Sequence, residues 1–407
     1  MHPGKFGNRA MKQLKIAVVL LVGWAACVGL HAAEPRNTGP WNIAELTPTP
    51  AAEFGKLSAG VQEVYYDNVP LRGKPTRVFA YYAKPTEGEG PFPAMLCVHG
   101  GGGKAFPEWA RLWAKRGYVA LAMDLAGKGP DGKPHADAGP DQDDNGKFGE
   151  FTLDGVRDMW SYHAVAAVVR GHSLLASLPE VDKNRIGVTG ISWGGYLTCI
   201  VAGVDERIKV AVPVYGCGFL GDNSAWLGRF SKMTVEQRKL WLDQFDPSRY
   251  LPGATCPMLF VNGTNDFAYP LDSYQKSYSL PQGPVTLCIR VKMPHGHGVG
   301  WAPEEIGMFA DSVLKKGSPL PRIGPMEVVE GNVSASTGGP ASIKQAELNY
   351  AVASGPWQNR VWKSVPAVVG RGTVRATIPA ARPLVMYLNI TDERGALVSA
   401  PHVVLLK

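Results

Sequence analysis

The chain has 407 residues, of which 45% are hydrophobic, and its formal net charge is +7 at pH 7. This hydrophobic content is ample for a full core and indicates one large domain with a smaller part beside it. Residues 1–33 hold four basic residues and no acidic one, so the rest of the chain has a net charge of +3. The basic balance therefore gives no support for nucleic-acid binding.

The first 33 residues have the pattern of a secretory signal peptide. Lys12 and Lys15 precede an apolar run, residues 16–30, and small residues at 32–33 provide a cleavage site. The apolar run is short for a membrane span, although a retained signal anchor stays the alternative. We expect residues 1–33 to be removed from a secreted or periplasmic protein without membrane contact.

Residues 34–60 are rich in Pro and Ala, and we expect them to lie on the surface. The buried strand predicted at 92–98 is followed at once by His99 and the glycine run 100–103. A glycine run at this place can offer a backbone N–H to a developing oxyanion, and Gly101 is the predicted donor. Gly100 and Gly102 stay open as alternatives. No Gly-Lys-Ser/Thr follows, so a phosphate loop is disfavoured, and His99 is predicted to brace the loop.

A helix at 109–116, a strand at 118–123 and a long amphipathic helix at 153–178 are expected next. The polar stretch 127–149 separates the last two. It contains the first half of a calcium loop, but position 12 of that loop would be Thr152 in place of Glu. We therefore favour a solvated active-site loop and predict no metal.

The clearest motif is Gly190-Ile191-Ser192-Trp193-Gly194, which lies between a strand at 185–189 and an apolar helix at 196–202. A G-x-S-x-G sequence in a strand-turn-helix context is typical of a nucleophile elbow. Glycines permit the sharp turn, which lifts the serine hydroxyl above the sheet. Ser192 is the predicted nucleophile, and the N–H of Trp193 is the predicted second oxyanion donor.

A serine nucleophile needs a base and an acid that orients the base. Asp266 follows the predicted strand 257–261, which would place it at the same sheet edge as Ser192; Asp222 and Asp272 are weaker candidates. Between strands, residues 216–252 form an aromatic-rich insertion, which either caps the site or packs a helix onto the body.

The base is expected in Pro294-His295-Gly296-His297-Gly298, after the strand predicted at 285–293. We predict His297 as the base because it lies deeper in the loop, between two glycines. His295 stays as the alternative base. The other histidine would then be a supporting hydrogen-bond partner.

After a linker near Gly317, the pattern changes to short strands and turns. Residues 322–407 are predicted to form a small immunoglobulin-like β-sandwich, which either binds carbohydrate or braces the larger domain. Every candidate catalytic residue precedes the linker, so we expect this sandwich to be dispensable for hydrolysis of small esters. The six cysteines show no zinc spacing, and without Cys27 an odd number remains.

These motifs, in this order, resemble the α/β-hydrolase superfamily over residues 61–317, and within it the dienelactone hydrolase, acetyl xylan esterase and prolyl-oligopeptidase-like group. The resemblance implies a doubly covered, mostly parallel sheet with a first β-hairpin at 61–85. His297-Gly298-Val299 is similar to the His-Gly-Phe of dienelactone hydrolases, whose nucleophile, however, is cysteine. Prolyl oligopeptidases carry a propeller that is missing here.

The sequence thus predicts an exported serine carboxylic-ester hydrolase that acts on short-acyl esters, with acetylated polysaccharide as a plausible substrate. It needs no cofactor, and its partner is a small ester or an esterified polysaccharide. The alternatives are a serine peptidase with the same triad, and a catalytically inactive carbohydrate-binding protein on a hydrolase scaffold. The oligomeric state is not predicted.

Overall fold

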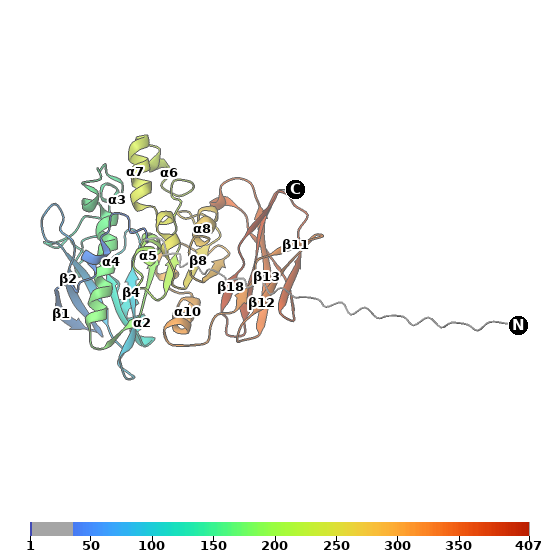
Figure 1. Cartoon of the computed structure of the whole chain (residues 1–407), viewed down its shortest axis with the longest axis horizontal. Coiled ribbons are helices and arrows are strands. Elements are labelled where there is room, and N and C mark those ends of the chain that lie inside the picture. The colour runs from blue at the N-terminus through green and yellow to red at the C-terminus, as the bar shows by residue number, and fades with distance from the viewer. Residues whose placement is uncertain (2–35, 407) are drawn as a thin grey trace. The chain divides into compact units, whose positions relative to one another are not determined.

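A mixed sheet forms the centre of the fold. The computed structural model describes Met1 and residues 36–406, so the predicted signal peptide, apart from Met1, lies outside the described residues. Within the described part, nine strands follow the order β1-β2-β3-β5-β4-β6-β7-β8-β9 (Figure 1). The strands are β1 (Ala52–Ser58), β2 (Val61–Asp67), β3 (Arg77–Ala83), β4 (Phe92–Val98), β5 (Val119–Met123), β6 (Val181–Ile191), β7 (Ala211–Val214), β8 (Met258–Gly263) and β9 (Val285–Arg290).

The central strands are parallel and buried on both faces. Pairing is antiparallel from β1 to β5 and parallel from β5 to β9. Every residue of β5, β7 and β8 is buried, which requires cover on both sides of the sheet. The helices that contact the strands of this sheet include α2 (Pro107–Lys115), α4 (Trp160–Ser177), α5 (Trp193–Val204) and α10 (Glu304–Leu314). The predicted doubly covered, mostly parallel sheet is confirmed.

Two boundaries differ from the expectation. The sheet starts at Ala52, inside the segment 34–60, for which no strand was predicted. All seven residues of β1 are exposed, so this strand carries no hydrophobic alternation that would reveal it. The long helix begins at Trp160, because a 3-10 turn at Val156–Asp158 and the extended Met159 precede it.

The other helices are shorter and lie in the segments that connect the strands or precede them. The insertion 216–252 contains two helices and two 3-10 turns, and the polar stretch 127–149 contains one short helix. The remaining helices are α1 (Ile43–Leu46), α3 (Asp144–Phe148), α6 (Leu227–Phe230), α7 (Val235–Phe245), α8 (Leu271–Tyr278) and α9 (His297–Gly300).

Antiparallel strands make up the C-terminal part, drawn in orange to red in Figure 1. Two sheets are found there within the described residues, which is consistent with the expected β-sandwich. The strands are β10 (Arg322–Ile323), β11 (Glu327–Val329), β12 (Asn332–Gly338), β13 (Ile343–Val352), β14 (Lys363–Pro366), β15 (Val368–Gly370), β16 (Thr373–Thr377), β17 (Leu384–Asp392), β18 (Leu397–Ser399) and β19 (Val403–Leu405).

The core holds the described cysteines. Cys97, Cys199, Cys217, Cys256 and Cys288 are buried free thiols. Of the helices in the described part of the chain, none is long and apolar enough to cross a bilayer.

Candidate active site

The residues predicted from the motifs meet at one edge of the sheet. Strands β4, β6, β7, β8 and β9 are parallel neighbours, so their carboxyl ends lie side by side. The glycine run, Ser192, Tyr215, Asp266 and His295 follow these five strands in turn. Ligands of open parallel sheets bind outside this edge, because the loops there can bring side chains from several strands together.

Ser192 sits in a strained turn between β6 and α5. Its backbone has φ 58° and ψ −116°, a conformation that L-residues other than glycine rarely adopt. The turn is held by Ser192 N–H donating to Val214 O and by Tyr196 N–H donating to Ser192 O. A Cβ on Gly194 would lie 1.9 Å from Val98 O, and one on Gly190 would lie 2.1 Å from Gly194 O. Both glycines are therefore required by close backbone approach.

A carboxylate and an imidazole pair beside the elbow. Asp266 Oδ2 lies 2.6 Å from Nδ1 of His295, and the Asp266 side chain is fully buried. Its other oxygen accepts from the N–H groups of Ala268 (2.9 Å) and Tyr269 (2.7 Å). The carboxylate thus fixes Nδ1 of His295 as the protonated nitrogen and leaves Nε2 free to accept a proton. The structure differs here from the prediction, because Asp266 pairs with His295 and not with His297.

Two aromatic rings, one from the segment after β7 and one from the segment after β8, pack against His295. The ring of Tyr215 stacks on the imidazole at a centroid distance of 4.4 Å, and Phe267 packs on it at 4.8 Å. The Tyr215 hydroxyl donates to Pro294 O at 2.7 Å, and burial raises its pKa, so this donor stays protonated. The sequence analysis did not find either residue. Tyr215 directly follows β7 and Phe267 directly follows Asp266, and these two positions could have indicated a role at the site.

His297 is engaged with the backbone of the glycine run. The Gly100 N–H donates to Nε2 of His297 at 2.9 Å, and the ring packs against Phe106. Burial, together with the nearby His99 and His295, lowers the pKa of His297 to about 4. Its Nε2 lone pair is occupied, so accepting a proton from Ser192 would break this bond.

His99 braces the same loop, as predicted. The Leu125 N–H donates to Nε2 of His99 at 2.8 Å, so the proton must lie on Nδ1, which is 2.7 Å from Gly100 O. Burial lowers the pKa of His99 to about 4 and keeps it in this neutral form. The imidazole therefore ties the glycine run to the end of β5.

The glycine run lies directly over the elbow. A Cβ on Gly100 would lie 2.9 Å from Ser192 Cβ, and one on Gly101 would lie 3.0 Å from Trp193 Cδ1. The Gly100 N–H is already bonded to His297, which leaves Gly101 as the nearer candidate donor. Trp193 is the first residue of α5, and its N–H therefore has no acceptor within the helix. The arrangement places Gly100 against Ser192 and Gly101 against Trp193.

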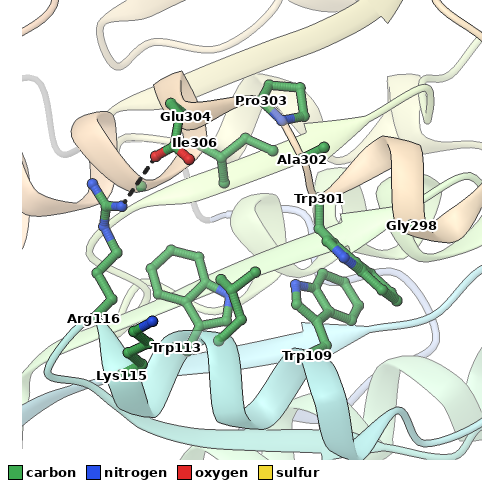
Figure 2. Close-up of a pocket in the computed structure, with 12 residues that line it drawn as sticks. Trp109, Trp113, Lys115, Arg116, Gly298, Trp301, Ala302, Pro303, Glu304 and Ile306 are labelled. Carbon is green, nitrogen blue, oxygen red and sulfur yellow. Dashed lines mark ion pairs between the residues drawn. The ribbon is translucent and has the colours of Figure 1, made fainter.

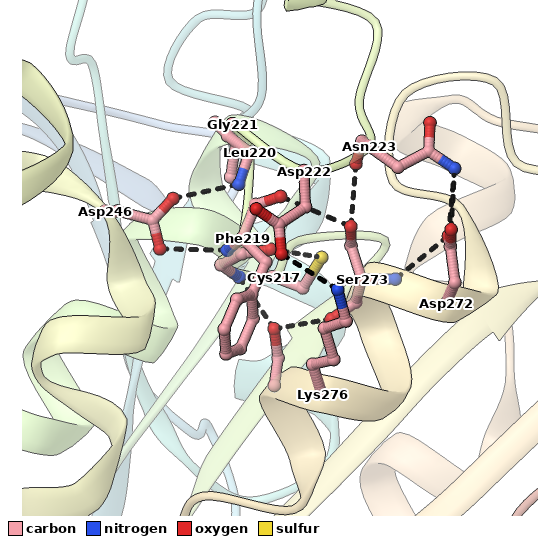
Figure 3. Close-up of polar contacts among 12 residues, drawn as sticks. Cys217, Phe219, Leu220, Gly221, Asp222, Asn223, Asp246, Asp272, Ser273 and Lys276 are labelled. Carbon is pink, nitrogen blue, oxygen red and sulfur yellow. Dashed lines mark hydrogen bonds and ion pairs between the residues drawn. The ribbon is translucent and has the colours of Figure 1, made fainter. Parts of the chain in front are cut away.

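The two weaker acid candidates are used elsewhere (Figure 3). Asp222 pairs with Lys276 at 2.8 Å, and Asp272 accepts from the Asn223 amide at 2.9 and 3.0 Å. In the same region Asp246 accepts from the N–H groups of Phe219 and Leu220 at 2.9 Å each. These contacts fold the start of the insertion and leave Asp266 as the acid beside a histidine.

The insertion supplies aromatic rings to the elbow. Measured between ring centroids, Trp193 lies 4.5 Å from Trp226 of the insertion. It also lies 5.7 Å from Phe148, which belongs to α3 and not to the insertion. Behind them, Trp241 and Phe245 of α7 are fully buried and pack that helix onto the body. The insertion therefore does both things that the sequence left open: part of it walls the elbow and part of it packs.

The half calcium motif is used to cap a helix. Asp143 accepts from Gly146 N–H at 2.6 Å at the start of α3. No group of three or more His, Cys, Asp or Glu side chains in residues 36–406 is placed to hold a metal ion.

A pocket of about 540 Å³ borders the histidine loop, between α2 and the segment 298–307 (Figure 2). Trp109, Trp113 and Trp301 form part of its wall, and an ion pair between Arg116 and Glu304 closes one side. Neither Ser192 nor the Asp266–His295 pair lines this pocket, so it is separate from the elbow.

Known proteins are similar to this chain in sequence and in fold. Residues 45–234 match the model of the acetyl xylan esterase family, a segment that contains the glycine run and Ser192. An acetyl xylan esterase from Paenibacillus sp. R4 superposes with a TM-score of 0.55 at 23% identity, over 67% of this chain and 92% of that one. The chain therefore has the fold of the acetyl xylan esterases, and part of its sequence is similar to theirs.

Curated relatives of this chain include an acetyl esterase, Axe7A, of Xylanibacter ruminicola. It is 26% identical over 205 residues, which cover 47% of this chain and 46% of the relative. The uncharacterized peptidase YuxL of Bacillus subtilis is 26% identical over 206 residues, which cover 47% of this chain and 28% of the relative. The chain thus spans less than half the length of either relative.

Proposed function

We propose that this α/β-hydrolase is a serine carboxylic-ester hydrolase whose triad is Ser192, His295 and Asp266. The observation that carries the proposal is the 2.6 Å contact between Asp266 and His295, on loops that leave the sheet edge beside the Ser192 elbow. His295 replaces His297 as the base. The match to the acetyl xylan esterase family supports the ester-hydrolase activity.

In the proposed reaction, Nε2 of His295 takes the proton of the Ser192 hydroxyl as its oxygen attacks the ester carbonyl. Asp266 stabilises the imidazolium and keeps it oriented. The N–H groups of Trp193 and Gly101 hold the oxyanion, and the imidazolium then protonates the leaving alcohol. Water, activated by the same imidazole, attacks the acyl-enzyme and releases the acid, which returns Ser192 to its starting state.

We propose that the substrate is a short-acyl ester carried by a polysaccharide. We also propose that the enzyme is exported. The rings of Trp193 and Trp226 pack against each other beside the elbow, and such bulky side chains favour a small acyl group. The name of the Axe7A relative and the matched family support an acetyl group. Export rests on the signal-peptide pattern of residues 1–33.

The test is kcat/KM for p-nitrophenyl esters with acyl chains of two to twelve carbons, measured beside acetylated xylan and a proline peptide anilide. We expect acetyl and propionyl esters to be the best substrates. Each methylene that cannot enter the pocket forfeits roughly 0.8 kcal/mol of burial energy. A maximum at eight carbons or more would overturn the short-acyl proposal, and turnover of the anilide alone would favour a peptidase.

A further inference from the structure

The loop that carries Asp266 is held by the C-terminal sandwich. The Asn265 amide Nδ2 donates to the backbone oxygens of Gln358 and Arg360, both at 2.9 Å. These two residues flank the end of a 3-10 turn, Trp357–Asn359, between β13 and β14. Asn265, the residue next to the proposed catalytic acid, therefore donates both of its side-chain amide hydrogens to the C-terminal sandwich.

The same side chain is also tied to the loop of the base. The Thr264 hydroxyl donates to Asn265 Oδ1 at 2.9 Å and accepts from Lys292 N–H at 2.9 Å. Lys292 lies three residues before His295. A continuous set of hydrogen bonds thus runs from the C-terminal sandwich through Asn265 and Thr264 to the histidine loop.

A second contact fixes the strand that leads into that loop. Strand β9 is the last in the nine-stranded sheet, so its outer backbone groups lack a neighbouring strand. The Ile289 N–H donates to the Ser399 hydroxyl at 2.8 Å, and Ile289 O accepts from the Asn389 amide at 3.1 Å. Side chains of β17 and β18 therefore satisfy the open edge of β9.

From these contacts we infer that the C-terminal sandwich is part of the catalytic apparatus and that Asn265 is a positioning residue for Asp266. This inference rests on the proposed triad. Asp266 holds His295 through one short contact, and a shift of about 1 Å at such a contact can cost about 100-fold in rate. The sandwich thus has a role in catalysis although every proposed catalytic residue precedes the linker.

The experiment compares two full-length variants that each remove one amide contact to the sandwich. Asn265→Ala removes the contact beside the triad. Gln275→Ala removes a matched contact, Gln275 Nε2 to His402 O at 2.9 Å, which involves no proposed catalytic residue. With p-nitrophenyl acetate, well below the melting temperature, we expect Asn265→Ala to lower kcat about 10- to 100-fold with KM within about twofold. Gln275→Ala should keep both constants.

A double-mutant cycle with Asp266→Ala separates positioning from general destabilisation. If Asn265 acts through Asp266, Asn265→Ala should have no further effect once Asp266 is alanine. Equal losses in Asn265→Ala and Gln275→Ala, or a full Asn265 effect in the Asp266→Ala background, would overturn the inference. An active Asp266→Ala enzyme would overturn the triad itself, whereas an impaired Asp266→Ala beside a normal Asn265→Ala would overturn only the positioning role. Asn265→Ser, which can still donate one hydrogen bond, is the second variant and should give an intermediate kcat.

Discussion

The two histidines of the His-Gly-His segment differ in what occupies their ring nitrogens. In His295, Nδ1 faces the Asp266 carboxylate, whereas in His297, Nε2 accepts the Gly100 N–H. The sequence places both on one loop after β9, and its spacing cannot tell which ring faces the acid. The prediction of His297 depended on its position in the loop and on the resemblance to dienelactone hydrolases. Which histidine pairs with Asp266, however, depends on the direction of the two side chains.

Substitution of each histidine checks this assignment. His295→Ala should lower kcat/KM for p-nitrophenyl acetate by at least about 1,000-fold, because the serine loses its base. His297→Asn should lose about tenfold, because a shorter side chain holds the glycine run less well. Equal folding of the two variants, shown by circular dichroism, is the control. A larger loss in His297→Asn would return the role of base to His297.

At the scale of elements, the sequence predicted the buried strands of the large sheet and missed several exposed or short strands. Strands β4, β5 and β8 were foreseen because their residues form apolar runs of strand length. The exposed strand β1 and the short strands β11, β14 and β15 have no such pattern. The elbow was foreseen because its glycines mark a turn that few other residues permit.

Two glycine substitutions test the packing of the elbow. Gly194→Ala would place a methyl group 1.9 Å from the backbone oxygen of Val98, which cannot move without distorting β4, so we expect loss of activity and a lower melting temperature. Gly228→Ala, in α6, meets no atom within 4 Å and should leave activity unchanged and stability equal or up to about 1 kcal/mol higher. A fully active Gly194→Ala enzyme would show that the elbow is not packed as described.

At the scale of the whole molecule, the sequence predicted two parts but not how they cooperate. The linker near Gly317 and the change to short strands were readable, whereas the bonds from Asn265 to Gln358 and Arg360 join residues more than 90 positions apart. Such contacts are set by how the two parts pack. No pattern along the chain reports them.

The buried histidines predict how stability depends on pH. Burial lowers the pKa of five histidines to about 4: His99, His163, His172, His297 and His402. The folded state therefore resists the protonation that these histidines undergo near pH 6.5 in the unfolded chain. Their stabilisation is complete above the unfolded pKa and is lost as the pH falls toward 4. The unfolding free energy should drop by at least about 2 kcal/mol between pH 7.5 and 5, the effect of one such group. Urea unfolding at both pH values measures it, and His163→Leu should weaken the dependence. Constant stability would contradict the prediction.

The central claim is that Ser192 is an activated nucleophile, and reaction of the full-length protein with a fluorophosphonate followed by peptide mass spectrometry tests it most directly. A serine reacts at a useful rate only when a base is placed to take its proton. The account predicts one labelled peptide, modified at Ser192, with labelling abolished in Ser192→Ala and strongly slowed in His295→Ala. A folded protein that takes up no label, or one labelled at another residue, would contradict it.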